Sequence, residues 1–376
     1  MTAKNRFILL STLIAMFLII APYLVLYSLG YRVDFENMRI VPTGGIYVRI
    51  QPSTADITID SKIKDSTGVF SNSVFFQNLI PGEHTVSIKK EGYYDYEKNL
   101  SVKGKEVTKL ENVILFNKNI IFEAQASIDQ FLELKKKPQE KFIIRNRNLY
   151  YSSSEENSQL TSLQKSTAIL KGIITFKISD NKIIWMSSDG FLKSSSLEGK
   201  NIENISQSPL KIDIKKSYNL EIFAQHIFLK ENTGLYLFDN ETKSFHKFYS
   251  NVKNLKISPD GQKIAYFNDN EIFIYYLQNL PIGEINNANI NDYSQKITDV
   301  YWLNNDYIIF EDNEKIIISE IDHRGNINKI SLPEQLSLTN GNNIIIENPE
   351  IIFDNSSKKL YILTKEELIS SDKLLP

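Results

Sequence analysis

The side chains that most often carry chemistry are few in this sequence and widely spaced. None of the four histidines has a partner at the spacing of a metal site or of a Ser-His-Asp triad; they are His84, His226, His246 and His323. The sequence contains no cysteine, which excludes disulfides, thiolate metal ligands and a cysteine nucleophile. It also lacks the glycine-rich loops that bind nucleotides. We therefore expect no catalytic residue, no metal and no cofactor, although catalysis by residues scattered over loops stays an alternative.

Clusters of aspartate and asparagine offer the oxygen ligands that Ca²⁺ prefers, with Asp269, Asp312 and Asp354 as candidates. An EF-hand loop needs a central glycine and a terminal glutamate at fixed positions, and the sequence has no such loop. Asp and Asn are also favoured where a strand reverses direction. We therefore interpret these clusters as hairpin turns and predict no calcium site.

Three tyrosines that lie close together, Tyr93, Tyr94 and Tyr96, offer aromatic faces on which a sugar or a peptide could stack. Their alternation fits core packing and cross-strand pairs in a sheet equally well. We favour packing over a binding platform.

The charge of the chain is nearly balanced, with 43 basic against 45 acidic residues. A nucleic-acid surface needs a basic excess gathered on one face, so we expect no nucleic-acid partner. The run Lys135-Lys136-Lys137 is flanked by Glu133 and Glu140. This pattern favours a solvated face over contact with anionic headgroups or a wall polymer.

An apolar run near the N-terminus predicts on which side of a membrane the rest of the chain lies. Residues Phe7 to Leu29 carry no charge, and Lys4 and Arg6 precede them. A helix needs roughly 20 apolar residues to cross the hydrocarbon of a bilayer, and basic flanks stay in the cytoplasm. A cleaved signal peptide starts in the same way, but this run is long and ends without an Ala-x-Ala-like site. We predict a cytoplasmic stub over 1–6, a transmembrane helix over 7–29, a short stalk over 30–44 and an extracytoplasmic remainder.

Residues 45–117 are predicted to form a small all-β sandwich. Short runs of β-branched and aromatic residues alternate with turn formers, and no helical periodicity interrupts them. The predicted strands include Ile46–Ile50, Ile57–Ile59, Thr85–Ile88 and Val113–Phe116.

The stretch from Leu79 to Tyr93 resembles the signature of PEGA domains, which are β-sandwich modules of prokaryotic surface and envelope proteins. The matching residues are structural and not catalytic: Pro81, Gly82, Glu83, His84, Gly92 and Tyr93. Pro81 and Gly82 suit a tight turn, because proline presets φ and glycine accepts a positive φ. His84 stands where the family name implies alanine, at the start of a strand.

Residues 118–376 show a loose repeat of a hydrophobic strand, a polar turn and a second strand. The first strands recur at roughly 40 to 50 residues, a period typical of propeller blades; they are Lys182–Trp185, Ile227–Lys230, Lys263–Phe267, Tyr307–Phe310 and Lys359–Ile362. Turn formers stand between the strands at Ser188–Gly190, Asn268–Asn270 and Glu311–Asn313. The length suits about six blades, with five to seven possible.

One repeat is close to that of TolB-type and WD40-like propellers. A strand enters Ser258-Pro259-Asp260-Gly261, and a second strand follows. The resemblance implies a structural turn at these four residues and a β-propeller after the PEGA-like domain.

Taken together, the sequence predicts an all-β protein of the cell envelope with an N-terminal transmembrane helix. We expect it to bind or scaffold an extracytoplasmic partner, either a protein or a wall polysaccharide, through its PEGA-like and propeller domains. An extracytoplasmic enzyme or ligand sensor that uses the propeller channel is the alternative.

Overall fold

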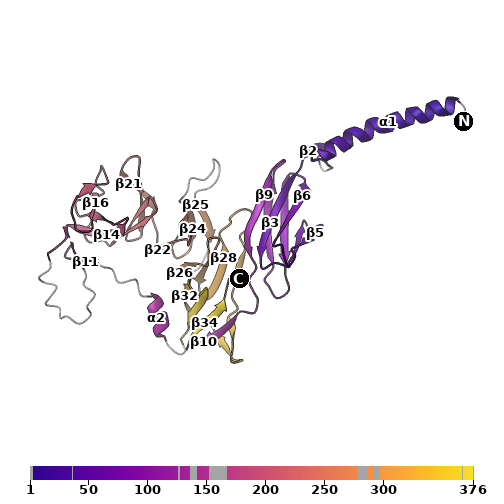
Figure 1. Cartoon of the computed structure of the whole chain (residues 1–376). Coiled ribbons are helices and arrows are strands. Elements are labelled where there is room, and N and C mark those ends of the chain that lie inside the picture. Colours follow the sequence, from indigo (N-terminus) through magenta and orange to yellow (C-terminus); the bar gives the residue numbers. More distant parts are fainter. Residues whose placement is uncertain are drawn as a thin grey trace.

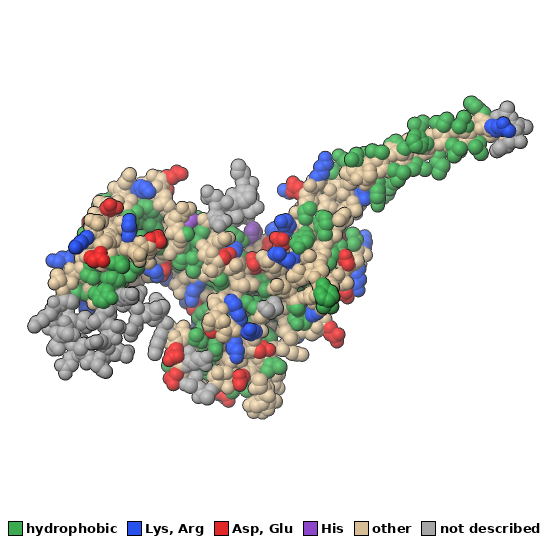
Figure 2. Space-filling model, viewed as in Figure 1, with side chains coloured by type: hydrophobic (Ala, Val, Ile, Leu, Met, Phe, Trp, Pro, Cys, Tyr) green, Lys and Arg blue, Asp and Glu red, His purple; other side chains and the backbone are tan. Residues whose placement is uncertain are grey.

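The computed structural model describes residues 3–35, 37–125, 128–135, 142–151, 167–277, 287–291, 296–365 and 367–375. The protein is mostly β, as predicted, with one long N-terminal helix and a series of small sheets (Figure 1). The helix α1 (Ala3–Ser28) projects from the remainder of the chain, and hydrophobic side chains cover it (Figure 2). The most apolar 18-residue window of α1 has a mean hydropathy of 2.5 and is not buried, so α1 could serve as a membrane anchor or a signal sequence.

The segment predicted as a stalk is a β-hairpin. Its strands are β1 (Tyr31–Asp34) and β2 (Arg39–Pro42), paired antiparallel with Tyr31 opposite Pro42. The carboxylate of Asp34 closes the turn, because it accepts hydrogen bonds from the backbone and side chain of Asn37 and from Arg39. The sequence has no glycine or proline in this turn, and side-chain bonds of this kind cannot be read from the sequence alone, so residues 30–44 were predicted as a stalk.

Residues 44–114 form the predicted sandwich of two sheets. One sheet has the order β6-β3-β9 and the other β5-β4-β7-β8. Their buried faces enclose one apolar core that includes Ile46, Ile57 and Val86. The strands are β3 (Gly44–Gln51), β4 (Asp56–Ile59), β5 (Ile63–Ser66), β6 (Ser73–Leu79), β7 (Gly82–Lys89), β8 (Tyr96–Val102) and β9 (Val107–Ile114).

The chain after the sandwich forms successive antiparallel sheets. After a three-stranded sheet come four meanders of four strands each, β14–β17, β18–β21, β22–β25 and β26–β29. In each of the four meanders, the strand that the sequence predicted as the first of a repeat is the second strand of the sheet. The outer strands have weaker hydrophobic patterns and were not predicted. The strands are β11 (Phe142–Arg145), β12 (Asn148–Tyr151), β13 (Leu170–Lys171), β14 (Ile173–Ser179), β15 (Lys182–Ser187), β16 (Leu192–Ser196), β17 (Glu203–Asn204), β18 (Tyr218–Phe223), β19 (His226–Glu231), β20 (Gly234–Asp239), β21 (Ser244–Tyr249), β22 (Asn254–Ile257), β23 (Lys263–Phe267), β24 (Ile272–Tyr276), β25 (Asn287–Asn291), β26 (Ile297–Trp302), β27 (Tyr307–Asp312), β28 (Lys315–Glu320) and β29 (Lys329–Ser331).

The last sheet contains strands from both ends of the β-rich region. Their order is β31-β30-β10-β34-β33-β32. The strand that follows the sandwich, β10, pairs with the C-terminal strand β34, with Phe122 opposite Ser371. A short helix that the all-β prediction missed, α2 (Asp129–Lys135), packs Phe131 against this sheet. The strands are β10 (Ile121–Ala124), β30 (Gln335–Leu338), β31 (Asn343–Ile345), β32 (Glu350–Asp354), β33 (Lys359–Leu363) and β34 (Leu368–Lys373).

Hydrophobic cores join each sheet of the β-rich region to the next one along the chain. Within the described residues, no such core joins the last sheet to β11–β13, so the sheets do not close into a ring. The arrangement has the blade-like sheets that the repeat predicted but does not show a closed propeller or a central channel.

Candidate functional site

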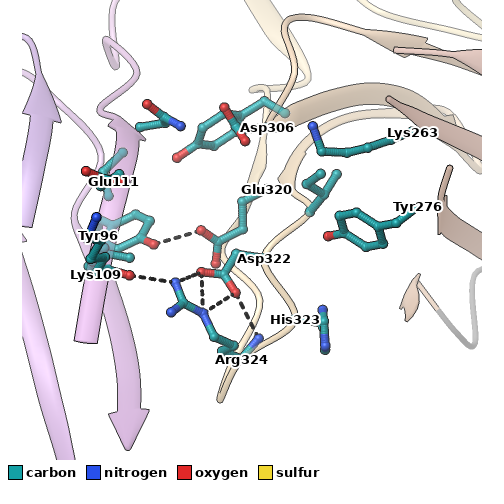
Figure 3. Close-up of a pocket in the computed structure, with 15 residues that line it drawn as sticks. Tyr96, Lys109, Glu111, Lys263, Tyr276, Asp306, Glu320, Asp322, His323 and Arg324 are labelled. Atoms are coloured by element: carbon teal, nitrogen blue, oxygen red, sulfur yellow. Dashed lines mark hydrogen bonds and ion pairs between the residues drawn. The ribbon is translucent and has the colours of Figure 1, made fainter. Parts of the chain in front are cut away.

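The sandwich and the β-rich region meet through an interface of buried polar groups. Strand β8 alternates strictly, so that Tyr96 and Lys98 face inward at the edge of the sandwich. There they meet the end of β28 and the segment that follows it: Glu320 is the last residue of β28, and Asp322 and Arg324 come after it. Figure 3 shows Tyr96 beside these three residues. We call this contact the domain junction.

At the centre of the domain junction, Lys98 forms an ion pair with Glu320. The side chain of Lys98 is fully buried, and its Nζ lies 2.7 Å from Glu320 Oε1. Nζ also donates to the carbonyl oxygens of Asp322 at 2.5 Å and Asn326 at 2.7 Å, so all three of its hydrogen atoms have acceptors. A buried charge of this kind is tolerated because it is both paired and fully hydrogen-bonded.

Glu320 is held by further donors from both domains. The hydroxyl of Tyr96 donates to Oε2 at 2.7 Å, while the backbone N and Nδ2 of Asn328 donate to Oε1 at 2.8 and 2.9 Å. Burial raises the pKa of Tyr96 far above its ordinary value, and the neighbouring charge of Glu320 raises it further. The tyrosine therefore stays neutral and acts as a fixed donor.

A second ion pair lies beside the first. Arg324 Nε lies 3.0 and 3.1 Å from the two carboxylate oxygens of Asp322, and its Nη2 lies 2.7 Å from Oδ2. Nη2 also donates to the carbonyl oxygen of Lys109 in β9 at 3.0 Å (Figure 3). Burial would raise the pKa of Asp322, but the hydrogen bonds from Arg324 and the attraction of Lys98 bring it below its ordinary value.

The exposed edge of β8 is covered by two asparagines. Asn326 Oδ1 accepts from the backbone N of Asn99 at 2.8 Å, and its Nδ2 donates to the carbonyl oxygen of Glu97 at 2.6 Å. Asn328 Oδ1 accepts from the backbone N of Glu97 at 3.2 Å. The free edge of the sandwich is thus paired with side chains of the β-rich region, which removes it as a template for other strands.

The domain junction borders a cavity of about 540 Å³. Its walls carry donors, acceptors and an aromatic ring from both domains, among them Lys109, Asn112, Lys263, Tyr276, Asp306 and His323 (Figure 3). Burial raises the pKa of Asp306 above its ordinary value, and the positive charge of Lys263 opposes this rise. Within the described residues, His323 Nδ1 is buried without a hydrogen-bond partner. The cavity has the size and mixed lining of a site for a small polar ligand.

Comparison with known proteins agrees with the architecture of the first domain. Residues 43–115 match the PEGA domain family. No curated protein matches the chain. The chain is similar to a functionally unknown protein from Desulfotomaculum acetoxidans DSM 771, whose crystal structure is known. That match has 12% sequence identity and a TM-score of 0.36, and it covers 60% of this chain and 73% of that one.

The motif residues of the PEGA domain hold its turns. Gly82 begins β7 with φ near +151°, a conformation that glycine accepts readily. His84 joins two turns, because its Nδ1 lies 2.7 Å from Asp60 Oδ2 and its Nε2 lies 2.7 Å from the carbonyl oxygen of Ile80. The described residues that line the cavity include none from the set Pro81, Gly82, Glu83, His84, Gly92 and Tyr93.

The turn Ser258–Gly261 joins β22 to β23. Asp260 Oδ1 accepts from Ser258 Oγ at 2.5 Å and from the backbone N of Gln262 at 3.0 Å, while Gly261 has φ of +70°. Asp260 also pairs with Lys263 at 3.1 Å, and Lys263 lines the cavity. The structural turn predicted from sequence therefore positions one of the groups of the cavity.

The acidic residues considered as calcium ligands have other partners. Asp269 pairs with Lys253 at 2.9 Å, and Asp312 accepts from the backbone N of Lys296 at 3.3 Å. Burial would raise the pKa of Asp354 slightly, but hydrogen bonds from two serines in the following turn outweigh this effect and lower the pKa to about 2. The described part of the chain holds no group of three or more metal-ligating side chains.

Tyr93 and Tyr94 pack against apolar cores, and Lys135, the described residue of the basic run, forms a surface ion pair. Tyr93 packs on the core of the PEGA domain and Tyr94 on the core of the last two sheets, so the three tyrosines form no shared platform. Lys135 pairs with Glu350 and lies over the ring of Phe131. Lys136 and Lys137 lie outside the described residues.

The groups that join the two domains were not predicted from the sequence. Lys98 and Glu320 lie 222 residues apart, and nothing in the local pattern pairs them. One signal was available: Lys98 occupies an inward position in the alternation of β8, where an apolar residue is expected.

Proposed function

We propose that this chain is a membrane-anchored, non-catalytic protein of the cell envelope that binds or scaffolds an extracytoplasmic partner. Its PEGA domain and β-rich region act together on the outer side of the membrane. The observation that carries this proposal is the domain junction, which joins the two domains through buried ion pairs and covers the edge of β8.

The apolar helix α1 supports the membrane location. It is long enough to cross a bilayer, and its apolar 18-residue window is not buried by the described part of the protein. Lys4 and Arg6 lie at its N-terminal end, which by the positive-inside rule sends the PEGA domain outward. PEGA domains are extracytoplasmic, so the two arguments agree on the side of the membrane.

The buried groups favour a binding or scaffolding role over catalysis. The charged groups of Lys98, Glu320 and Asp322 are engaged in the ion pairs and hydrogen bonds of the domain junction, which makes them poor candidates for a general base. A general base must reach a proton on a substrate. These residues instead fix the relative position of two surfaces, as a scaffold requires.

The partner is proposed to be an envelope protein or a wall polysaccharide. A ligand sensor or enzyme is the second candidate, and one observation favours it: the interdomain cavity carries Asp306, His323 and Lys263. This site would lie at the domain junction, because the described residues form no propeller channel.

Protease treatment of spheroplasts that carry the full chain tests the topology. We expect external protease to remove the region after α1 while a cytoplasmic control protein stays intact. Protection of that region, alongside cleavage of a known exported protein, would overturn the proposal. Crosslinking in the same membranes then identifies the partner.

A further inference from the structure

We propose that the β1–β2 hairpin is a second membrane contact, which inserts apolar side chains into the lipid headgroup layer beside α1. The inference rests on the proposed membrane anchoring of α1 and goes beyond it. A stalk would hold the PEGA domain away from the bilayer, whereas a hairpin that contacts lipid would hold it against the surface.

The hairpin presents an apolar tip to solvent. Phe35 is 78% exposed, Met38 is 82% exposed and Ile40 is 55% exposed. Scattered single apolar residues on a surface need no explanation, but these three belong to one short hairpin. They follow closely along the chain after the exposed apolar residues of α1 and after Leu29, which is 65% exposed.

The hairpin is fixed to the last turn of the helix. Thr43 closes the base of the hairpin, because it donates to the carbonyl oxygen of Gly30 through its backbone N at 2.8 Å and through Oγ1 at 2.7 Å. Arg32 lies 3.5 Å above the ring of Tyr27 and donates to the carbonyl oxygen of Tyr27 at 2.9 Å. The hairpin consequently lies beside the C-terminal end of α1 (Figure 1). If α1 spans the bilayer, this end lies at the headgroup level.

The chemistry of the hairpin matches that level of the membrane. Aromatic and apolar side chains enter the boundary between headgroups and acyl chains, and basic side chains favour anionic headgroups. Arg39 is an exposed base of the hairpin, and Asp34 is buried in the turn rather than presented to lipid. Because Arg39 pairs with Asp34 at 3.3 Å, the apolar side chains decide the occupant of this surface, and it is the bilayer that α1 would cross.

The test uses the full-length protein in liposomes of phosphatidylglycerol and phosphatidylethanolamine. Because the chain has no cysteine, one introduced cysteine can be labelled with a polarity-sensitive fluorophore without background. Three variants are compared: Met38→Cys in the hairpin, Ile14→Cys within α1, and Ile202→Cys as a distant exposed control. Ile202 precedes β17, in the sheet of β16, which lies far from α1 (Figure 1).

We expect the labels at positions 14 and 38 to shift their emission to the blue and to be quenched by spin-labelled lipid, while the label at 202 is unaffected. If the label at 14 responds and the label at 38 behaves like that at 202, the hairpin proposal is wrong and the anchor stands. If the label at 14 does not respond, the anchor is wrong and the inference falls with it.

Discussion

At the scale of single residues, the pair Lys98–Glu320 decides whether the two domains hold together. Removing one partner of a buried pair leaves the other charged without compensation, at a cost of about 3 to 5 kcal/mol. We expect Lys98→Met to lower the free energy of unfolding of the full chain by that amount in urea titrations. Lys64→Met is the matched control, because Lys64 pairs with Asp56 in solvent and should contribute less than about 1 kcal/mol.

A double variant separates the pair from general packing damage. Lys98→Met combined with Glu320→Leu removes both charges, so we expect it to be more stable than Lys98→Met alone. Equal stability of the single variant and the unaltered protein would show that the pair does not hold the domain junction.

From the pKa of the Asp322 carboxylate we predict how the stability that this residue contributes depends on pH. Burial would raise its pKa, but the bonds from Arg324 and the attraction of Lys98 lower it below 3.8. A carboxyl group with a depressed pKa in the folded state stabilises the fold above its unfolded pKa, and this contribution is lost as the pH falls through the folded pKa. The stability difference between the unaltered protein and Asp322→Asn should therefore be constant above pH 3.8 and shrink below it. A difference that is independent of pH in urea titrations contradicts this account.

At the scale of elements, the turn at Gly325 must approach β8 closely. A Cβ added at Gly325 would lie 2.1 Å from the carbonyl oxygen of Asn99, and φ there is +60°. Gly341 is the matched control, with φ of +83° and no atom within 4 Å of an added Cβ. Each alanine substitution should cost about 1 to 2 kcal/mol of backbone strain. Only Gly325→Ala should also push β8 away.

Hydrogen exchange measures this displacement directly. In Gly325→Ala, the amides of Glu97 and Asn99 should lose protection, because Asn328 and Asn326 accept from them across the domain junction. Unchanged protection at both amides would show that β8 does not depend on this turn.

A comparison of the helices, strands and turns with their predictions shows which parts of the fold could be predicted from the sequence. The strands and turns with strong local patterns were found, such as β7 after Pro81-Gly82 and β23 after Ser258–Gly261. The β1–β2 hairpin was missed, because its turn depends on side-chain bonds to Asp34 rather than on a glycine. The pair Lys98–Glu320 was missed because the sequence shows no long-range pairing between strands of different domains.

At the scale of the whole molecule, the domain junction joins the PEGA domain and the β-rich region through a buried ion pair, and we expect the two domains to unfold together. A protein that scaffolds a partner needs its binding surfaces at a fixed separation. In the proposed role, the buried polar groups of the domain junction fix that separation. The β-rich region is a series of sheets, and β10 pairs with the C-terminal strand β34 in the last of them.

Crosslinking mass spectrometry of native membranes that contain the full-length protein tests the central claim most directly. We predict that lysines of the PEGA domain and of the β-rich region crosslink to each other across the domain junction and also to one extracytoplasmic envelope protein or wall fragment. Crosslinks to cytoplasmic proteins would contradict this account.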